Sequence, residues 1–295
     1  MYKLITILLL TSLSIANANS GFALLKMDVV PRSAALAGCE YLSSTSLHPL
    51  NYNPAALYSK NLTVFTAGYS KFLEDGQTGF IGVGKDTGYG SAGLEISWIN
   101  LDNLDGREVP SEEAQYQFNA GFIDIAAGYA YPITENIHLG IAGKYLTEKI
   151  EFETADGYAL SGGIKISHLL PNLTLAVAGN NFGAMGELNI CATPLPSSLE
   201  TGAGYDYTIA DFKATAAIRD IYLTEDKENL VNCGLELSYA NRIFMRGGYR
   251  FNNEGLPFSA GLGINYNGLC FDYAFSSFAD DFGQIHSFAL SYSLR

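Results

Sequence analysis

The sequence predicts an all-β protein: a transmembrane antiparallel β-barrel of about 14 strands with an N-terminal luminal hatch segment. Three observations support this fold class. Stretches of about ten residues, rich in Tyr, Phe, Ile, Val, Ala and Gly, follow one another to the C-terminus. Apolar residues alternate with small polar ones inside these stretches. The links between them are alternately long and short, which is typical of outer-membrane barrels.

Composition excludes several other classes of protein. The chain has 295 residues, with 30 Asp plus Glu against 17 Lys plus Arg, for a net charge of −13. A protein that binds nucleic acid needs a basic stripe on its surface. This sequence has no Lys/Arg-rich run, so nucleic acid is not an expected ligand. Only 16% of residues are charged, while 19 Tyr, 17 Phe and 31 Gly favour strands over coiled coil or disorder.

The N-terminus has the pattern of an exported protein. Lys3, an apolar run over 4–15 and an Ala-x-Ala site at 16–18 predict a signal peptide over residues 1–18. After it, no apolar run approaches the ~18 residues of a spanning helix, so membrane residence requires a barrel. Residues 19–60 lack strand alternation. Because fourteen strands enclose more space than side chains fill, this segment is predicted to be a hatch or plug inside the lumen.

Residues 61–295 are predicted to form the fourteen-stranded outer-membrane β-barrel. The strands are expected at 61–72, 77–86, 89–101, 115–131, 136–149, 157–168, 172–182, 199–209, 211–221, 229–241, 243–252, 257–266, 268–278 and 284–294. In the last strand, Phe288, Leu290 and Tyr292 share one face and small residues occupy the other. A soluble sandwich also alternates, but its wet face usually carries long charged side chains, whereas small polar residues suit the inside of a barrel.

The connections give a separate test of the barrel. Links after the even strands are short, as at 87–88, 132–135 and 267–268, and links after odd strands include the long segments 102–114 and 183–198. Barrels with tight periplasmic turns and long outer loops alternate in this way, and Greek-key sandwiches have no reason to do so. A soluble secreted β-sandwich or adhesin is therefore kept only as an alternative.

Scattered charges on the polar face are the candidate luminal contacts. The main ones are Lys144, Lys165, Glu236, Arg246, Arg250 and Asp272. They suit either an ion-pair lattice that pins the hatch to the wall or part of a ligand path. Phe118 and Phe122 are the candidates for an inward-facing apolar pocket. Their strand's parity is predicted to break near Ile123-Asp124, and such a bulge could open a lateral gap for an apolar ligand.

Motifs for catalysis and cofactors are weak. The stretch 79–85 satisfies the first positions of a P-loop, but Asp86 stands where Ser or Thr must bind magnesium, and no helix follows. No nucleophile elbow is found, and neither the cysteines nor the histidines have metal-ligand spacing. We therefore predict no enzyme activity, cofactor or metal. Whether Cys39 and Cys191 pair in a disulfide is left open.

Several segments resemble the PorV/PorQ family of bacterial outer-membrane proteins, relatives of the fatty-acid transporter FadL. In the hatch, the leader 22–38 with Arg32 resembles the family's opening, and Asn53-Pro54-Ala55-Ala56-Leu57 resembles its Asn-Pro-Ala-Gly-Leu motif. The remaining similarities are at 179–183, 194–196, 246–250, 261–263, 271–275 and 286–292. In one departure, the chain ends on Leu294-Arg295, where barrel insertion signals usually end on an aromatic residue.

The resemblance implies residence in the bacterial outer membrane, surrounded by its lipid, and a hatch motif of Arg32, Asn53 and Pro54. It implies one of two functions. The first is a carrier or docking role for secreted proteins, with cargo or type IX secretion components as partners. The alternative is a FadL-like channel for passive transport of small hydrophobic molecules.

Overall fold

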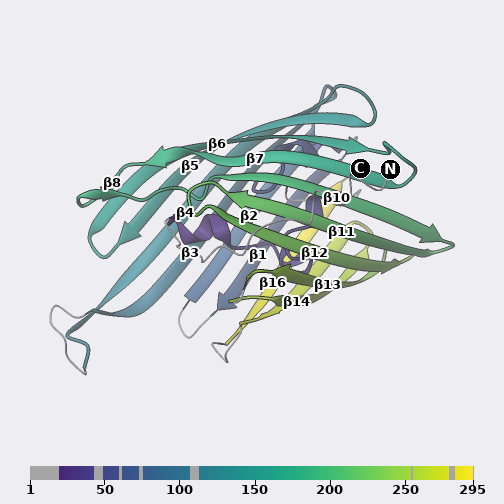
Figure 1. The fold of residues 1–295 in the computed structure, drawn as a ribbon. Coiled ribbons are helices and arrows are strands. Elements are labelled where there is room, and N and C mark those ends of the chain that lie inside the picture. Colours follow the sequence, from purple (N-terminus) through teal and green to yellow (C-terminus); the bar gives the residue numbers. More distant parts are fainter. Residues whose placement is uncertain are drawn as a thin grey trace.

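Fourteen antiparallel strands close into one barrel, in which the first strand pairs with the last (Figure 1). The computed structural model describes residues 20–42, 49–59, 62–72, 76–106, 113–253, 255–278 and 283–294. The predicted signal peptide, 1–18, lies outside these ranges. The predicted fold class, a transmembrane barrel with a luminal N-terminal hatch, is confirmed. No helix among the described residues is long and apolar enough to cross a membrane.

The barrel strands are β1 (Thr63–Phe72), β2 (Gly76–Asp86), β3 (Ser91–Gly106), β4 (Tyr116–Pro132), β5 (Ile137–Ile150), β6 (Glu153–Ser167), β7 (Leu173–Met185), β10 (Ser198–Ile209), β11 (Phe212–Leu223), β12 (Glu228–Tyr239), β13 (Ile243–Phe251), β14 (Phe258–Tyr266), β15 (Leu269–Ser277) and β16 (Gln284–Leu294). A small hairpin of β8 (Glu187–Leu188) and β9 (Cys191–Ala192) lies in the link between β7 and β10, which the sequence predicts as a plain loop.

Burial follows the strand period, so the two faces of the wall are distinct. On β16, Phe288, Leu290 and Tyr292 point outward and are exposed, while Ser287 and Ser291 are buried. The charges predicted on the polar face are almost all buried toward the lumen, with relative exposures of 3–6% for Glu95, Lys144, Lys165, Glu200, Glu236, Arg246, Arg250 and Asp272. An apolar outside and a charged inside are what a lipid-embedded barrel requires.

The wall is taller on the side of β3 to β7 than the sequence predicts. β3 continues to Gly106 instead of ending at 101, and β6 begins at Glu153 instead of 157. The link between β5 and β6, expected to be of intermediate length, is therefore a turn at 151–152. Outward-facing Thr154 and Asp156 are polar, so this part of β6 lacks the apolar alternation by which a lipid-facing strand is recognised.

Two bulges interrupt the ladder, and neither lies at the predicted position. One extra residue falls on β3 between Leu101 and Leu104, and another on β7 opposite Leu160 and Gly162. The predicted parity break at Ile123-Asp124 is wrong, because Ile123 is exposed, Asp124 is buried and their register with β3 is continuous. Apolar residues occupy both faces of β4 here, so alternation could not show which face is luminal.

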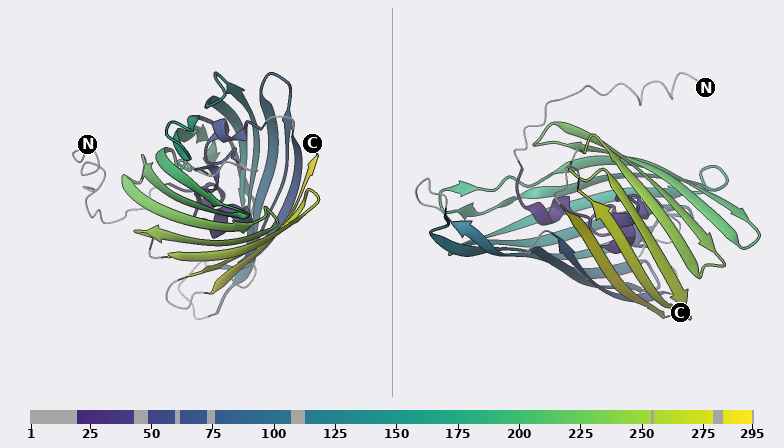
Figure 2. Two further views of the ribbon diagram at one scale, coloured as in Figure 1. Left: turned by 90° about the vertical axis from the view of Figure 1, so that its right-hand side faces the viewer. Right: turned by 90° about the horizontal axis from the view of Figure 1, so that it is seen from below.

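The hatch crosses the lumen from the end with the longer links to the opposite end. Its helices are η2 (Ala23–Lys26), α1 (Pro31–Ala35), η3 (Glu40–Leu42) and η4 (Pro54–Leu57). Ser20 is held by Asp226 in the β11–β12 link through hydrogen bonds of 2.7 and 2.5 Å. α1 packs on β13 to β16, and η4 packs on β4 to β6. In an end-on view the purple hatch is encircled by strands (Figure 2).

Candidate functional site

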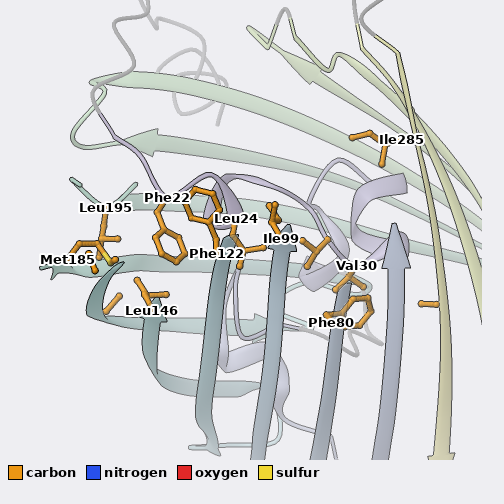
Figure 3. Close-up of a cluster of buried hydrophobic side chains, with 14 residues drawn as sticks. Phe22, Leu24, Val30, Phe80, Ile99, Phe122, Leu146, Met185, Leu195 and Ile285 are labelled. Atoms are coloured by element: carbon orange, nitrogen blue, oxygen red, sulfur yellow. The ribbon is translucent and has the colours of Figure 1, made fainter. Parts of the chain in front are cut away.

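An apolar cluster fills the part of the lumen near the longer links (Figure 3). We call it the luminal apolar cluster; its buried members are Phe22, Leu24, Val29, Val30, Phe80, Ile99, Phe122, Leu146, Ala155, Ala159, Met185, Leu195, Ile285 and Ala289. It is continuous with half-buried apolar residues such as Leu101, Leu188 and Phe278. The interior of an outer-membrane barrel is usually polar, so this cluster marks a region suited to an apolar molecule.

Hatch side chains occupy the centre of this cluster. Phe22 is buried and stacks edge-on against Phe122, with ring centroids 5.4 Å apart. Its backbone is left-handed, with φ of 52°, which is uncommon for a bulky residue and directs the chain into the lumen. Lys26 donates to the carbonyl of Ser20 at 2.7 Å and so steadies this leader. The wall therefore supplies an apolar site that the chain's own N-terminal segment fills.

Phe118 and Phe122, predicted as a pair, have different environments. Phe122 is 7% exposed and belongs to the luminal apolar cluster. Phe118 lies further along β4, beside the bulge of β3, where it is half-buried and contacts Tyr116 with ring centroids 6.2 Å apart. Phe122 therefore lies within the luminal apolar cluster, whereas Phe118 lies outside it.

A chain of buried ion pairs lies below the cluster and connects α1 with the wall. Arg32 of the hatch is 3.0 Å from Glu236, which accepts a 2.6 Å hydrogen bond from Arg246. Arg246 in turn donates to Asp272 at 2.5 Å. These predicted residues from α1, β12, β13 and β15 thus form one network, in which each guanidinium has a carboxylate partner. Such charges are stable in a low-dielectric site only when paired.

Two residues missed by the sequence analysis make a second connection. Asp28 of the hatch accepts from Arg250 of β13 at 2.7 Å and from Tyr52 at 2.9 Å. Arg219 of β11 pairs with Glu200 at 2.8 Å, and its guanidinium lies 5.1 Å from the ring centroid of Tyr52. Strand parity could have revealed Arg219 as luminal. Asp28 lies in an irregular segment, where no periodicity indicates which way a side chain points.

Lys144 and Lys165 are buried on the luminal faces of β5 and β6. Lys144 donates to Asn181 at the β7 bulge at 2.8 Å and lies 3.9 Å from Asp124. Lys165 interacts electrostatically with Asp206 of β10 and with Glu40 of the hatch. Lys144 thus connects β5 with β4 and β7 within the wall, whereas Lys165 interacts with both the wall and the hatch.

Asn53 and Pro54 of the hatch motif lie at the opposite end of the lumen, away from Arg32. Asn53 accepts from the backbone N–H of Ala55 at 2.9 Å and caps η4, and Pro54 occupies the first helical position. The amide of Asn53 donates to carbonyls of Ile164 and Val177 at 3.2 and 3.3 Å. Asn53 therefore begins η4 and also attaches the hatch to β6 and β7 through its side chain.

The described residues contain no cluster of His, Cys, Asp and Glu that could hold a metal ion. Cys39 and Cys191, whose pairing the sequence left open, are both free thiols. Burial raises the pKa of the Cys39 thiol to about 12, which keeps it protonated and unreactive. The P-loop-like stretch lies entirely within β2, where no helix N-terminus is available for a phosphate.

The contact between Asp28 and Arg250 predicts how the hatch responds to acid. Burial would raise the pKa of Asp28, but Arg250, Arg219 and two hydrogen bonds outweigh it and hold that pKa below the ordinary 3.8. A lowered carboxyl pKa stabilises the docked hatch fully above 3.8, and this stabilisation is lost as pH falls through the lowered value. Ion conductance in planar bilayers is expected to stay constant from pH 7 to about 4 and rise only below.

Asp28→Asn is the control for this titration, because it removes the ionisable group. The variant should have raised conductance already at neutral pH and no further step from this site in acid. A conductance step centred above pH 5 in the unmodified chain would contradict the assignment to Asp28.

No protein-family model matches the chain, and no curated protein matches it. Solved structures do. The P. putida toluene transporter TodX matches with TM-score 0.60 and 12% identity over 88% of this chain and 97% of TodX. A Pseudomonas aeruginosa FadL homologue matches with TM-score 0.55 and 11% identity, covering 89% and 97%. The Acinetobacter baumannii outer membrane protein Omp33 matches with TM-score 0.50 and 11% identity, covering 81% and 99%.

These identities are low, so the likenesses establish the fold. Omp33 is named as an outer membrane protein, and the other two are named as a transporter and a FadL homologue. None of these three names describes a carrier of secreted proteins, so the PorV/PorQ assignment and the secretion role stay predictions. The chain is a bacterial outer-membrane β-barrel with the fold of FadL-like transport proteins.

Proposed function

We propose that this protein is a channel through which small hydrophobic molecules cross the outer membrane passively. The observation that supports this function best is the luminal apolar cluster, which lies inside a wall whose other luminal residues are largely polar or charged. Burial of apolar surface in such a site stabilises a bound hydrocarbon by about 25 cal/mol per Å². Hydrophobic ligands are also the kind handled by the toluene transporter TodX, whose fold this chain shares.

Binding requires that the hatch leader move. Phe22 and Leu24 fill the cluster in this structure, so a ligand must displace them or pack in their place. Residues 20–26 are attached to the wall chiefly by the contacts of Ser20 and Lys26 with Asp226 and of Gly21 with the carbonyl of Pro194 at 2.9 Å. The ion pairs of Asp28 and Arg32 lie further along the hatch, so residues 20–26 can exchange with a ligand while the remainder stays docked.

A charge placed in the cluster tests this function. Phe122→Glu introduces a carboxylate that an apolar ligand cannot solvate, so we expect uptake of a monoaromatic hydrocarbon into cells or liposomes to fall about tenfold or more. Phe122→Leu keeps the site apolar and is the matched control, with uptake close to that of the unmodified chain. Full uptake by a folded Phe122→Glu protein would show that hydrocarbons do not pass through the cluster.

A further inference from the structure

A groove of about 910 Å³ opens in the barrel wall at the ends of β3, β4 and β5 near the longer links. Its lining includes Asn100, Gln117, Asn119, Lys149, Tyr116 and Phe152. Asn100, Gln117, Asn119 and Lys149 are exposed and share the outward face with Trp98, Ile123 and Tyr145, two or more residues away along the same strands. Phe118 and Ala120, which have the luminal parity of β4, also line it, so the groove follows the free edge of β4 and carries these polar side chains on its outward side. None of its lining residues is a buried member of the luminal apolar cluster.

The backbone around the groove is fixed by local hydrogen bonds. The bulge of β3 turns the N–H of Asn103 toward the side chain of Asn119, which accepts it at 3.1 Å. On the other side, β5 ends opposite Ala120, and the N–H of Glu151 donates to the carbonyl of Asn119 at 3.0 Å. The end of β4 thus extends past the β5–β6 turn and leaves a recess beside it. Its shape follows from the bulge and the turn.

The lining chemistry selects a neutral ligand rich in hydroxyl groups. The amides of Asn100, Gln117 and Asn119 offer both donors and acceptors, as hydroxyl groups do. The lining has one ammonium, Lys149, against two carboxylates, Asp102 and Glu151, so the groove does not favour a phosphate or other anion. So many polar groups also disfavour a hydrocarbon, which would leave them without hydrogen bonds.

Aromatic side chains at the rim add flat apolar surfaces. Phe152 is 88% exposed at the tip of the β5–β6 turn, and Tyr116 is 39% exposed on β4. Both rings offer a flat apolar surface for the C–H face of a sugar ring, and the hydroxyl group of Tyr116 adds a hydrogen-bonding group. Together with the amides, these rings point to an oligosaccharide as the ligand.

The position of the groove agrees with a sugar ligand. Toward the membrane the same outward face becomes apolar, with Trp98, Ile123 and Tyr145, and the groove lies directly beyond them. Long-linked barrel ends face the cell exterior, so this is the level of the outer leaflet's headgroups. We propose that the groove binds an oligosaccharide, either the headgroup of an outer-leaflet glycolipid or a free saccharide.

A peptide added as an extra strand fits the groove less well. On the side of β5, the edge of β4 is unpaired only at 116–118, because Asn119 already accepts from Glu151 and pairing with β5 starts at Ala120. Strands usually have five or six residues, so this edge is too short to hold one by backbone hydrogen bonds. Strand addition is therefore an outcome to test for.

The only tryptophan of the chain, Trp98, lies two residues from Asn100 on the same face and can report binding. The full protein in detergent is titrated with lipopolysaccharide, with the core oligosaccharide released from it, with lipid A and with an extended hexapeptide. We expect the released oligosaccharide to change Trp98 emission saturably. Tighter binding of intact lipopolysaccharide would identify the glycolipid as the source, and equal affinities would identify a free saccharide.

Two matched glycine variants test the location. A Cβ at Gly121 would meet Asn100 Oδ1 at 3.4 Å, so Gly121→Leu fits and fills the groove, whereas Gly247 on β13 has open space around it. Gly121→Leu should weaken saccharide binding about tenfold or more, and Gly247→Leu should not. If Gly121→Leu does not fold, Phe152→Ala replaces it. Its control is Tyr89→Ala, which changes an exposed aromatic residue at the opposite end of the barrel.

Three results would overturn the proposal. The first is an equal response to lipid A and lipopolysaccharide with no response to the released oligosaccharide. The second is binding of the hexapeptide alone. The third is unchanged saccharide binding by a folded Gly121→Leu protein. Hydrocarbon uptake by Gly121→Leu should match the unmodified chain, because its side chain points away from the lumen. The test of this groove is therefore independent of the proposed channel function.

Discussion

Replacing Gly140 with valine is expected to undock the hatch and make the barrel leak small polar solutes. Gly140 is on the luminal face of β5, where a Cβ would overlap the backbone of Pro54 and Ala55. Neither partner is a flexible side chain, so η4 must move away from the wall. Overpacking of this kind costs about 1–3 kcal/mol, which raises the population of undocked hatch about tenfold or more. Conductance in planar bilayers and sensitivity to a large antibiotic would measure the leak.

Gly143→Val is the matched control for this change. Gly143 lies on the same strand but faces outward, where the nearest atom to an added Cβ is Leu160 Cδ2 at 3.9 Å. This variant should insert, fold and conduct like the unmodified chain. If Gly140→Val is equally tight, the hatch does not close the lumen at η4, and the barrier to solutes lies elsewhere along the hatch.

Replacing Glu236 with alanine is expected to lower the free energy of unfolding by about 3–5 kcal/mol. Glu236 is the shared partner of Arg32 and Arg246, and the side chains of all three are 7% exposed or less. Its removal leaves Arg32 short of its nearest carboxylate and Arg246 with Asp272 as its partner in the network. Urea unfolding in detergent micelles, followed by the heat-modifiable shift on gels, would measure the loss.

Lys213→Ala serves as the comparison for Glu236→Ala. The pair of Lys213 and Asp206 has an N···O distance of 3.1 Å, but its side chains are 24% and 18% exposed. Water screens such a pair, so its loss should cost only about 0–1 kcal/mol. Equal stability of the two variants would mean that water reaches the network around Glu236 and replaces the lost interactions.

Strand periodicity accounts for how much of the barrel could be predicted. Predicted bounds for β13, β14 and β16 differ from the structure by at most one residue, because outward apolar residues alternate there with glycine, serine or charged residues on the luminal face. The same rule failed at the upper ends of β3 and β6. At these ends the outward residues are polar. The alternation of outward apolar and luminal polar residues that marks a lipid-facing strand is therefore absent.

For the candidate site, the sequence alone determined that Glu236, Arg246, Arg250 and Asp272 face the lumen, since a period of two fixes which face each side chain takes. Their partners were decided only by the tertiary structure. The hatch has no period, so the meeting of Asp28 with Arg250 and of Phe22 with Phe122 depends on how an irregular segment packs inside a closed wall. Alternation assigns a residue to a face, whereas contacts between distant segments arise only when the barrel closes around them.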